Sequence, residues 1–307
     1  MRTLIVGSGF VGRALAARLV GAGGEAVLAS RRPPARPAPG GTPIPWTPLD
    51  VTDADACRRA PDRAGADAMV LVHGPSDVTW CTANPDEALR VHAGAAERLA
   101  GAAAGRRLVL ISTDNVFDGE AELPVEATPP APANAYGRAK LAAEQALAGV
   151  PGATVLRVSL IYGWEPADGE KWLNFFAACA HRLRRGEPVA APHDQWTTPV
   201  LVDDVAAVTA AVLGAADLPL LHLGGPDRLS RADWARTIAA GLGASADLVT
   251  GVPRAGGRYA DRPRNSCLAS TLLHRHPATA GVAVHGVAAG ARALLAPAQP
   301  EPTEVAP

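Results

Sequence analysis

The stretch TLIVGSGFVG, residues 3–12, decides the fold class of this chain. It reads as a short buried strand and a G-x-G-x-x-G turn, and the helical face of Val11, Leu15 and Leu19 continues beyond it. The first glycine permits the tight turn, the second lets the backbone approach a pyrophosphate, and the third allows close packing of helix on strand. The helix N-terminus then faces the phosphates, which predicts a dinucleotide site; the alternative is a purely structural glycine turn. The site residues are Gly7, Ser8, Gly9, Phe10, Val11 and Gly12.

Beyond this stretch, apolar strands and helices alternate through the first half of the chain. The strands are apolar at nearly every position, which indicates burial on both faces of a parallel sheet. We therefore expect an α/β fold, a Rossmann-type doubly wound parallel sheet. Seven prolines between Pro33 and Pro48 predict a loop with at most a ragged edge strand. The expected strands cover Glu25–Ser30, Asp67–His73, Arg107–Ser112 and Ala153–Tyr162, and the expected helices cover Pro85–Ala100 and Asn134–Leu147.

The end of the second expected strand decides between the two nicotinamide cofactors. An adenosine ribose with a free 2′-hydroxyl requires Asp or Glu at that point. The sequence there is Ser30-Arg31-Arg32-Pro33, and no carboxylate occurs between Glu25 and Asp50. Arginine suits a 2′-phosphate, so Arg31 and Arg32 favour NADPH over NADH. The alternative is two solvated surface arginines.

Tyr136 and Lys140 are four residues apart on an expected helix, so their side chains share one face. Since the chain has three tyrosines and two lysines, this spacing is seldom met by chance. A nearby ammonium and an oxidised nicotinamide favour the phenolate and bring the tyrosine pKa toward neutrality. Tyr136 can then donate a proton to a carbonyl oxygen. The alternative is a half-buried tyrosine and a surface lysine.

The segment Ser112-Thr113-Asp114-Asn115 stands at the carboxyl end of an expected parallel strand. Ligands bind at that edge of such sheets, and a hydroxyl there can hydrogen-bond the reacting oxygen beside the tyrosine. Thr113 is the first candidate for this hydroxyl and Ser112 the second. For either residue the alternative is a strand-end cap.

These residues together resemble the extended short-chain dehydrogenase/reductases, and more narrowly the dTDP-4-dehydrorhamnose reductase group of sugar-nucleotide reductases. The resemblance implies a Rossmann-type domain, a small C-terminal substrate lobe, and an active-site trio of Thr113, Tyr136 and Lys140. Besides the glycine turn, it is carried by STDNVFDG at 112–119, YGRAKLAAE at 136–144, RVSLIYG at 157–163, DQWTTPVLVDDVA at 194–206 and RPRNSCLAS at 262–270.

The resemblance also assigns cofactor and substrate positions. On the cofactor side it places Asp50 and Val51 near the adenine, and His73 and Gly74 along the ribose and phosphates, with Ser112 beside them. Arg262 can pair with a diphosphate, the alternative being a solvated surface arginine. The expected substrate residues are Ser76, Val78, Asp114, Asn115, Leu160, Trp164, Asn174, Gln195, Trp196 and Arg262.

The same resemblance predicts the organisation of the chain. Helices are also expected at Leu173–Arg185 and at Ser230–Leu242, where Ser230 is the N-cap. A strand-to-helix segment is expected at Val200–Leu213 and a short strand at Leu220–Leu223. We expect an NADP-binding Rossmann domain over residues 1–162, completed by residues 196–223, a substrate-binding lobe over residues 163–195 and 224–295, and a disordered tail over residues 296–307.

Three positions depart from the family pattern. Related reductases usually have an aromatic residue where this chain has Asn115, a tryptophan where it has Leu160, and Asn where it has His92. The first two positions contact the sugar in the family. Four of the six tryptophans fall in segments expected around the substrate cleft, so stacking on sugar or base can have moved to one of them. The alternative is core or rim packing; the four are Trp80, Trp164, Trp172 and Trp196.

Composition excludes several other classes of protein. With 29 basic and 30 acidic residues, the chain shows no excess charge for binding nucleic acid. Its four cysteines are far apart in sequence, so no zinc or CxxC motif is present and a cytoplasmic location is expected. The histidines have no metal-ligand spacing, and no metal is expected. The apolar stretch Val205–Leu223 carries Thr209, Asp217 and Pro219, so no membrane span is expected.

The leading functional hypothesis is an NADPH-dependent ketoreductase acting on a nucleotide-activated sugar, a dTDP-4-keto-6-deoxy sugar above all. Tyr136 would be its proton donor. One alternative is a nucleotide-sugar epimerase or dehydratase, which retains its cofactor. Another is a non-catalytic NADP-binding regulatory subunit, since fold alone does not fix function. By analogy with the superfamily, the chain can form a homodimer.

Overall fold

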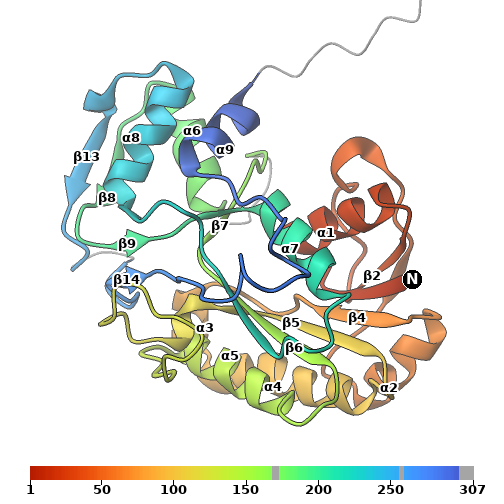
Figure 1. The fold of residues 1–307 in the computed structure, drawn as a ribbon. Coiled ribbons are helices and arrows are strands. Elements are labelled where there is room, and N and C mark those ends of the chain that lie inside the picture. Colours follow the sequence, from red (N-terminus) through yellow and green to blue (C-terminus); the bar gives the residue numbers. More distant parts are fainter. Residues whose placement is uncertain (168–172, 256–258, 297–307) are drawn as a thin grey trace, which may run out of the picture.

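A seven-stranded parallel sheet forms the centre of the computed structural model, which describes residues 1–167, 173–255 and 259–296 (Figure 1). Its strands lie in the order β11-β6-β5-β4-β1-β2-β3. The strand order reverses between β1 and β4, and in such sheets ligands bind outside the carboxyl ends of the strands at this point. The strands are β1 (Arg2–Val6), β2 (Glu25–Ser30), β3 (Trp46–Pro48), β4 (Ala68–Leu71), β5 (Arg107–Thr113), β6 (Ala153–Val158) and β11 (Leu220–Leu223).

Successive apolar side chains of the central strands point to opposite faces of the sheet. Ile5 joins the hydrophobic cluster on one face, whereas Leu4 and Val6 join the cluster on the other. In β4, Val70 and Met69 divide between the two clusters in the same way. The central positions of these strands are therefore apolar because both faces of the sheet are covered.

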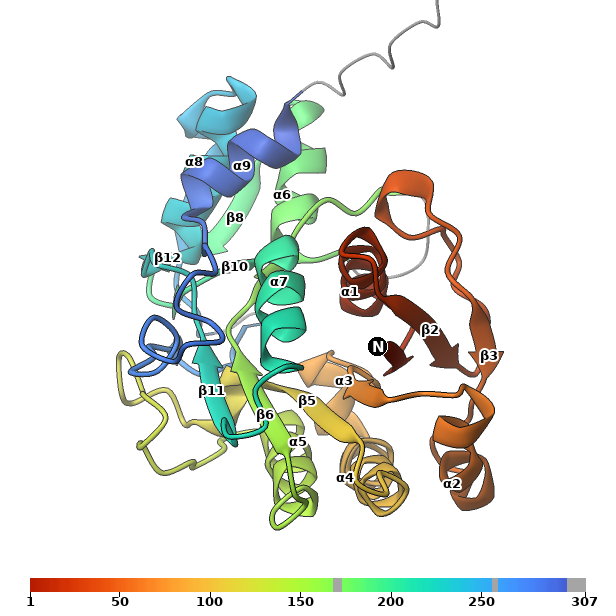
Figure 2. The ribbon, with the colours of Figure 1, turned by 45° about the vertical axis from the view of Figure 1, so that its right-hand side comes forward.

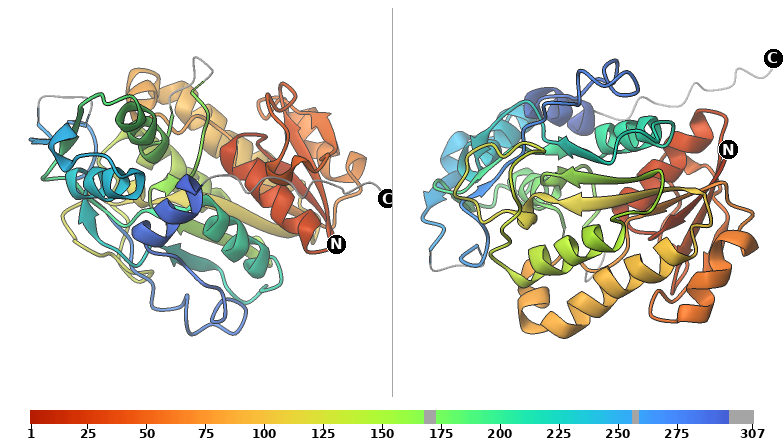
Figure 3. Two further views of the ribbon diagram at one scale, coloured as in Figure 1. Left: turned by 90° about the horizontal axis from the view of Figure 1, so that it is seen from above. Right: turned by 60° about the horizontal axis from the view of Figure 1, so that its bottom comes forward.

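Helices cover both faces of the sheet (Figure 2). Helices α1 and α7 lie on one face, and α2, α4 and α5 lie on the other. The right-hand view of Figure 3 shows α4 and α5 running side by side under the strands. The helices of this part are α1 (Phe10–Gly21), α2 (Ala54–Arg63), α3 (Val78–Ala83), α4 (Pro85–Gly101), α5 (Ala135–Ala146) and α7 (Val202–Val212).

The C-terminal part, whose helices lie above the sheet in Figure 1, has an aromatic core of its own. The ring of Tyr162 lies 5.4 Å from Trp234 and 5.5 Å from Phe176, measured between centroids. Helices α6 (Phe175–Arg184), α8 (Arg231–Leu242) and α9 (Val287–Leu295) surround this core. Three small sheets complete it: β7 (Ile161–Tyr162) with β10 (Val200–Leu201), β8 (Val189–Pro192) with β13 (Val249–Val252), and β9 (Trp196–Thr197) between β12 (Leu229–Ser230) and β14 (Asn265–Ser266).

Most elements expected from the sequence are confirmed, with ends shifted by a few residues. The strand expected over Ala153–Tyr162 is wrong in one respect, because it breaks after Val158 and resumes as β7 in another sheet. At the break, Ser159 Oγ lies 3.2 Å from Asp114 Oδ2 and 2.9 Å from the carbonyl oxygen of Ser266. The ragged edge strand is β3, which pairs with β2. Apart from Ala296, the expected disordered tail lies outside the described residues.

Two general findings concern membranes and metals. No helix in the described part of the chain combines the length and apolar character needed to cross a membrane. Among the same residues, no three His, Cys, Asp or Glu side chains gather to hold a metal ion. All four cysteines are buried.

Candidate active site

The turn between β1 and α1 forms a cradle at the carboxyl edge of the sheet. Gly7 has a φ of +125°, and a Cβ on it would lie 2.8 Å from the carbonyl oxygen of Val72. A Cβ on Gly12 would lie 1.9 Å from the carbonyl oxygen of Gly7, so the helix packs directly on the turn. A Cβ on Gly9 would meet nothing within 4 Å. The tight turn, the close packing and the open approach are the three features that a pyrophosphate cradle requires.

The N-terminus of α1 fits the charge of a pyrophosphate. Within the described residues no side chain caps it, and its first turn carries no acidic residue. Its N–H groups are thus oriented toward a ligand, and the helix dipole favours negative charge there. The Phe10 ring extends from this turn to Gly163, just after β7. A Cβ on Gly163 would lie 2.7 Å from Phe10 Cζ. Glycine at position 163 therefore leaves room for the Phe10 ring.

At the adenosine end of the cradle, Arg31 and Arg32 are exposed directly after β2. Ser30 Oγ lies 2.7 Å from Ser8 Oγ and accepts a hydrogen bond from Trp46 Nε1 at 3.0 Å. Ser8 and Trp46 thus hold Ser30 at the end of β2, and Arg31 and Arg32 follow it as exposed positive charges. Further along this edge Asp50 is exposed, and Thr52 lowers its pKa by hydrogen bonding. Val51 follows Asp50, and its carbonyl oxygen accepts from Arg98 Nη1 at 3.3 Å.

Thr113, Tyr136 and Lys140 come together where β5 ends beside the first turns of α5. The Thr113 side chain lies close enough to the Tyr136 hydroxyl to lower the tyrosine pKa. Lys140 is buried one turn further along α5, and its Nζ donates to the carbonyl oxygen of Ile111 at 2.6 Å. The spacing of four residues therefore places both α5 side chains against the end of β5, as the resemblance implies for the trio.

The pKa values in this group follow from burial. Burial raises the pKa of Tyr136, the Asp114 carboxylate raises it further, and the interaction with Thr113 opposes them. The sequence predicts a shift toward neutrality, whereas the groups of the chain alone hold Tyr136 as a neutral phenol. Burial lowers the pKa of Lys140 to about 8, and the Glu144 carboxylate opposes this effect only in part. A neutral phenol is the form that donates a proton in a reduction.

His73 and His92 lie behind this group, at the end of β4. His73 is buried, with Nε2 3.4 Å from the carbonyl oxygen of His92, and burial lowers its pKa to about 4. The Nε2 of His92 lies 3.0 Å from the carbonyl oxygen of Pro75, and its ring meets Tyr136 edge-on at 5.6 Å. Gly74 has a φ of +93°, and a Cβ there would lie 2.3 Å from the His92 ring. His92 therefore fills the space over Gly74 and joins this turn to Tyr136.

Ser112 and Thr113 point in different directions although they are neighbours on β5. Ser112 Oγ donates to Glu144, which pairs with Arg157 at 2.7 Å in a buried ion pair. Thr113 Oγ1 instead lies beside Tyr136 and donates to Asp114 Oδ1 at 3.1 Å. Of the two candidate hydroxyls, Thr113 is the one that belongs to the trio.

On the substrate side, Asp114 is buried at the end of β5 and faces the C-terminal part. Burial raises its pKa, although hydrogen bonds from Thr113, Asn115 and Ser159 oppose this effect. Asn115 donates to Asp114 Oδ1 at 2.8 Å, and its own Oδ1 accepts from Asn134. The structure thus joins Asp114 and Asn115 to each other.

Gln195 and Arg231 form a second buried pair in the same region. Arg231 Nε donates to Gln195 Oε1 at 2.7 Å, and Gln195 Nε2 donates to the carbonyl oxygen of Pro263 at 3.2 Å. The Arg231 guanidinium lies 5.1 Å from the ring of Tyr259, and that of Arg262 lies 5.6 Å from the same ring. Gln195 and Arg262 are therefore brought together through residues that the sequence analysis had not selected.

The remaining expected substrate residues are less closely grouped. Asn174 caps α6, and its Nδ2 lies 2.9 Å from both the Gly163 carbonyl oxygen and Glu165 Oε2, so its amide is used locally. Ser76 is exposed before α3, and Val78 is buried in the first turn of that helix. Leu160 lies between β6 and β7 and packs on the aromatic core of the C-terminal part.

The tryptophans expected around the cleft have different surroundings. The Trp164 ring lies 4.6 Å from the His181 ring and 4.4 Å from the Arg184 guanidinium, both of which belong to α6. The Arg228 guanidinium lies 4.6 Å over Trp196. Trp80 packs on the small cluster that also holds Tyr136. Trp172 lies outside the described residues.

Three residues at the site, Asn134, Ser159 and Arg231, were not selected from the sequence. Asn134 could have been found, because Asn at the start of a helix is a common N-cap and Tyr136 follows two residues later. Ser159 and Arg231 have no such local signal. They reach Asp114 and Gln195 only through contacts between segments that are far apart in sequence.

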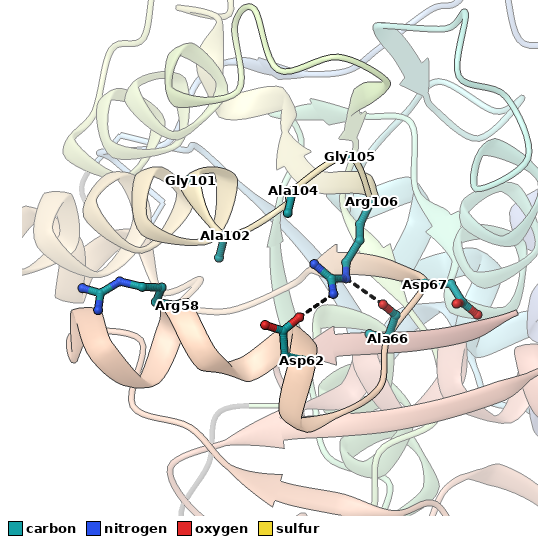
Figure 4. Close-up of a pocket in the computed structure, with 9 residues that line it drawn as sticks. All are labelled: Arg58, Asp62, Ala66, Asp67, Gly101, Ala102, Ala104, Gly105 and Arg106. Carbon is teal, nitrogen blue, oxygen red and sulfur yellow. Dashed lines mark hydrogen bonds and ion pairs between the residues drawn. The ribbon is translucent and has the colours of Figure 1, made fainter.

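A separate hollow of about 680 Å³ lies at the opposite edge of the sheet (Figure 4). Arg106 crosses it, donating to Asp62 Oδ1 at 2.5 Å and to the carbonyl oxygen of Ala66 at 2.8 Å. Arg106 precedes β5, whereas Thr113 ends that strand. The hollow is therefore separate from the group around Tyr136.

Comparisons with known proteins agree with this fold. A model of the family described as RmlD substrate binding domain matches residues 1–281. The chain is 33% identical over 229 residues to the probable low-salt glycan biosynthesis reductase Agl14 of Haloferax volcanii, which covers 73% of this chain and 76% of the relative. It is 36% identical over 265 residues to the dTDP-4-dehydrorhamnose reductase of Mycobacterium tuberculosis, with 81% and 82% covered. The structure of dTDP-4-dehydrorhamnose reductase from Bacillus anthracis in complex with NADP has a TM-score of 0.77 at 21% identity, covers 95% and 98% of the two chains, and shows the shared fold.

A doubly wound parallel sheet with a glycine cradle and a Thr–Tyr–Lys group at its carboxyl edge defines an extended short-chain dehydrogenase/reductase. The matching family model covers most of the chain, and the relatives exceed 30% identity over more than two thirds of it. The chain belongs to the dTDP-4-dehydrorhamnose reductase-like family of sugar-nucleotide reductases, as its motifs predict. Its family is one of oxidoreductases.

Proposed function

We propose that this protein reduces a keto group on a nucleotide-activated sugar, a dTDP-4-keto-6-deoxy sugar above all, with NADPH as the reductant. The observation that carries the proposal is the meeting of Tyr136, Thr113 and Lys140 next to the Gly7–Gly12 cradle. A reductase needs a cofactor cradle and a proton donor at the same edge of the sheet. The names of the curated relatives support the substrate class.

The cofactor fits the residues of the chain. Gly9 and the uncapped α1 N-terminus would hold the pyrophosphate, and Arg31 and Arg32 would bind the 2′-phosphate. Bound NADPH supplies a hydride to the carbonyl carbon. The other residues expected to contact the cofactor remain part of this proposal. They are Ser8, Phe10, Val11, Asp50, Val51, His73, Gly74 and Ser112.

The proton comes from Tyr136. Its phenol is neutral at pH 7 and donates to the carbonyl oxygen as negative charge develops there. Thr113 adds a second hydroxyl to the same oxygen once its proton turns away from Asp114. The Lys140 ammonium stabilises the phenolate that Tyr136 becomes. The C-terminal part, residues 163–195 and 224–295, would bind the nucleotide and sugar.

The test is a panel of dTDP-, UDP- and GDP-keto-sugars, followed by the loss of NADPH absorbance and by NMR of the product. The Tyr136→Phe variant is expected to lose about 10²- to 10⁴-fold in kcat, because it lacks the proton donor. Tyr162→Phe is the matched control, since that hydroxyl is buried in the aromatic core and has no hydrogen-bond partner among the described residues. No turnover with any keto-sugar would contradict the proposal, and tightly bound NAD⁺ in the purified protein would favour an epimerase or dehydratase.

A further inference from the structure

A directional chain of hydrogen bonds links the start of α5 to the carboxylate of Asp114. Asn134 Oδ1 accepts from the Gly137 N–H at 2.8 Å, and Asn134 Nδ2 donates to Asn115 Oδ1 at 2.9 Å. Asn115 Nδ2 then donates to Asp114 Oδ1 at 2.8 Å. All three bonds donate in the direction of the carboxylate, and the positive end of the helix dipole lies at the other end. The bonds therefore polarise one another.

The backbone of Asn115 also touches the catalytic helix. A Cβ on Gly137 would lie 1.9 Å from the Asn115 carbonyl oxygen, so the first turn of α5 rests directly on this residue. Tyr136 is the residue immediately before Gly137. Asn115 thus holds the turn that carries Tyr136 through both its side chain and its backbone.

The same residue holds Thr113, the partner of Tyr136. The Asn115 backbone N–H donates to Thr113 Oγ1 at 3.2 Å, and Asn115 Nδ2 lies 3.3 Å from that oxygen. Thr113 also donates to Asp114 Oδ1, and Ser159 Oγ lies 3.2 Å from Asp114 Oδ2. Asn115 is therefore the link between the hydroxyl that assists the reaction and the helix that supplies the proton.

These contacts use the hydrogen-bonding capacity of the Asn115 amide. Its two N–H groups are directed at Asp114 and Thr113, and its oxygen accepts from Asn134. Only the second lone pair of the oxygen remains for a substrate. The position that the resemblance assigns to a sugar contact is thus occupied by a group bonded within the protein.

We propose that Asn115 and Asn134 are positioning residues, which fix Tyr136 against Thr113 through the Asn134–Asn115–Asp114 chain. The proposal rests on the proposed reductase function for its kinetic readout. Neither residue transfers a proton or touches the reacting atoms. Each sets the distance and orientation between the two groups that do, and small errors of position are costly in catalysis.

The Asn134→Asp variant tests this role with the least disturbance of the fold. A carboxylate still caps α5 through the Gly137 N–H, but it has no N–H to donate to Asn115. We expect kcat to fall about tenfold to a hundredfold, while KM for the keto-sugar changes by less than about twofold. The matched control is the reverse exchange, Asp53→Asn at the cap of α2, where Asp53 accepts from the Asp55 and Ala56 N–H groups far from Tyr136. This control is expected to keep the kcat of the wild type.

A second variant, Asn115→Ala, gives a readout that needs no substrate. Loss of the chain is expected to speed hydrogen exchange of the α5 first-turn amides about tenfold, as for the loss of one buried hydrogen bond. If the alanine variant does not fold, Asn115→Asp retains the shape and the acceptor for Asn134 but removes the donor to Asp114. Unchanged kcat and unchanged exchange in the folded variants would overturn the proposal, as would a rise in KM alone. If the wild type reduces no keto-sugar but exchange still accelerates, the positioning role stands and the proposed function fails.

Discussion

At the scale of single residues, Lys140 determines the expected pH dependence of activity. Burial lowers its pKa from 10.5 to about 8, and its Nζ donates to the Ile111 carbonyl oxygen. As the pH rises through about 8, the ammonium loses its proton and no longer stabilises the phenolate. We therefore expect kcat/KM, measured from pH 6 to 10, to fall on the alkaline side near pH 8. Lys140→Arg keeps its charge throughout this range, so an unchanged alkaline limb in a folded Lys140→Arg would assign the limb to another group.

The same residue has the opposite effect on stability. Between about pH 8 and 10.5 the unfolded chain binds the lysine proton and the folded chain does not. The free energy of unfolding contributed by Lys140 therefore rises with pH in this window. Activity and stability should thus diverge above pH 8, which a general loss of structure would not produce.

Two single residues, Arg31 and Arg32, also determine the expected preference between NADPH and NADH. Arg31 and Arg32 are exposed at the end of β2, and no carboxylate occurs in the sequence between Glu25 and Asp50. We expect Arg31→Ala and Arg32→Ala to raise KM for NADPH about tenfold to a hundredfold, because a charge-assisted bond to phosphate is lost, with little effect on NADH. Arg58→Ala is the matched control, an exposed arginine at the opposite edge of the sheet (Figure 4). A wild-type preference for NADH would contradict the assignment.

At the scale of elements, the β1–α1 turn contains one glycine that is needed for packing, Gly12, and one that is expected to be needed for cofactor binding, Gly9. A Cβ at Gly12 would lie 1.9 Å from the Gly7 carbonyl oxygen, whereas one at Gly9 meets nothing within 4 Å. We expect Gly12→Ala to lower Tm, because the helix must move away from the turn. Gly9→Ala should keep the Tm of the wild type and raise KM for NADPH, since the methyl group occupies the path of the pyrophosphate. Thermal unfolding and NADPH kinetics check both variants; equal loss of Tm in the two would contradict this division.

The elements show how far the sequence predicts the structure. The central strands were predictable because their apolar runs bury both faces, and α1, α4 and α5 because of length and spacing. Helices α2 and α3 were not expected, although Asp53 and Asp77 cap them. Helix α3 has only six residues, and α2 contains a proline and buries only Cys57, Ala60 and Pro61, so neither carries the large apolar side chains that mark the other helices.

In the candidate site, too, the local arrangement was predictable from the sequence and the long-range contacts were not. Tyr136 and Lys140 share a helix face, so local spacing is sufficient to place them together. Ser112 and Thr113 point to opposite faces because side chains alternate along a strand. Which of the two meets Glu144, and the reach of Arg231 to Gln195, depend on packing between distant segments. No local pattern in the sequence contains that information.

At the scale of the whole molecule, a buried polar network joins the sheet to two distant loops. Glu144 on α5 pairs with Arg157 on β6, and Arg157 Nη1 lies 3.3 Å from His222 Nε2 on β11. The His222 backbone N–H donates to Glu126 Oε1 at 3.1 Å, and Glu126 also accepts from the Thr271 N–H at 2.9 Å. The network therefore connects α5 with segments near residues 126 and 271.

The centre of this network makes a prediction about global stability. Glu144 and Arg157 are both buried, so removing one partner leaves the other charge without compensation in a site with little water. We expect Glu144→Leu or Arg157→Met to lower the free energy of unfolding by about 3–5 kcal/mol in urea at pH 7. The double variant should lose less than either single variant, because it buries no unpaired charge. Additive losses would contradict the coupling and would mean that Ser112 and His222, rather than the ion pair, bear the interaction of these two side chains.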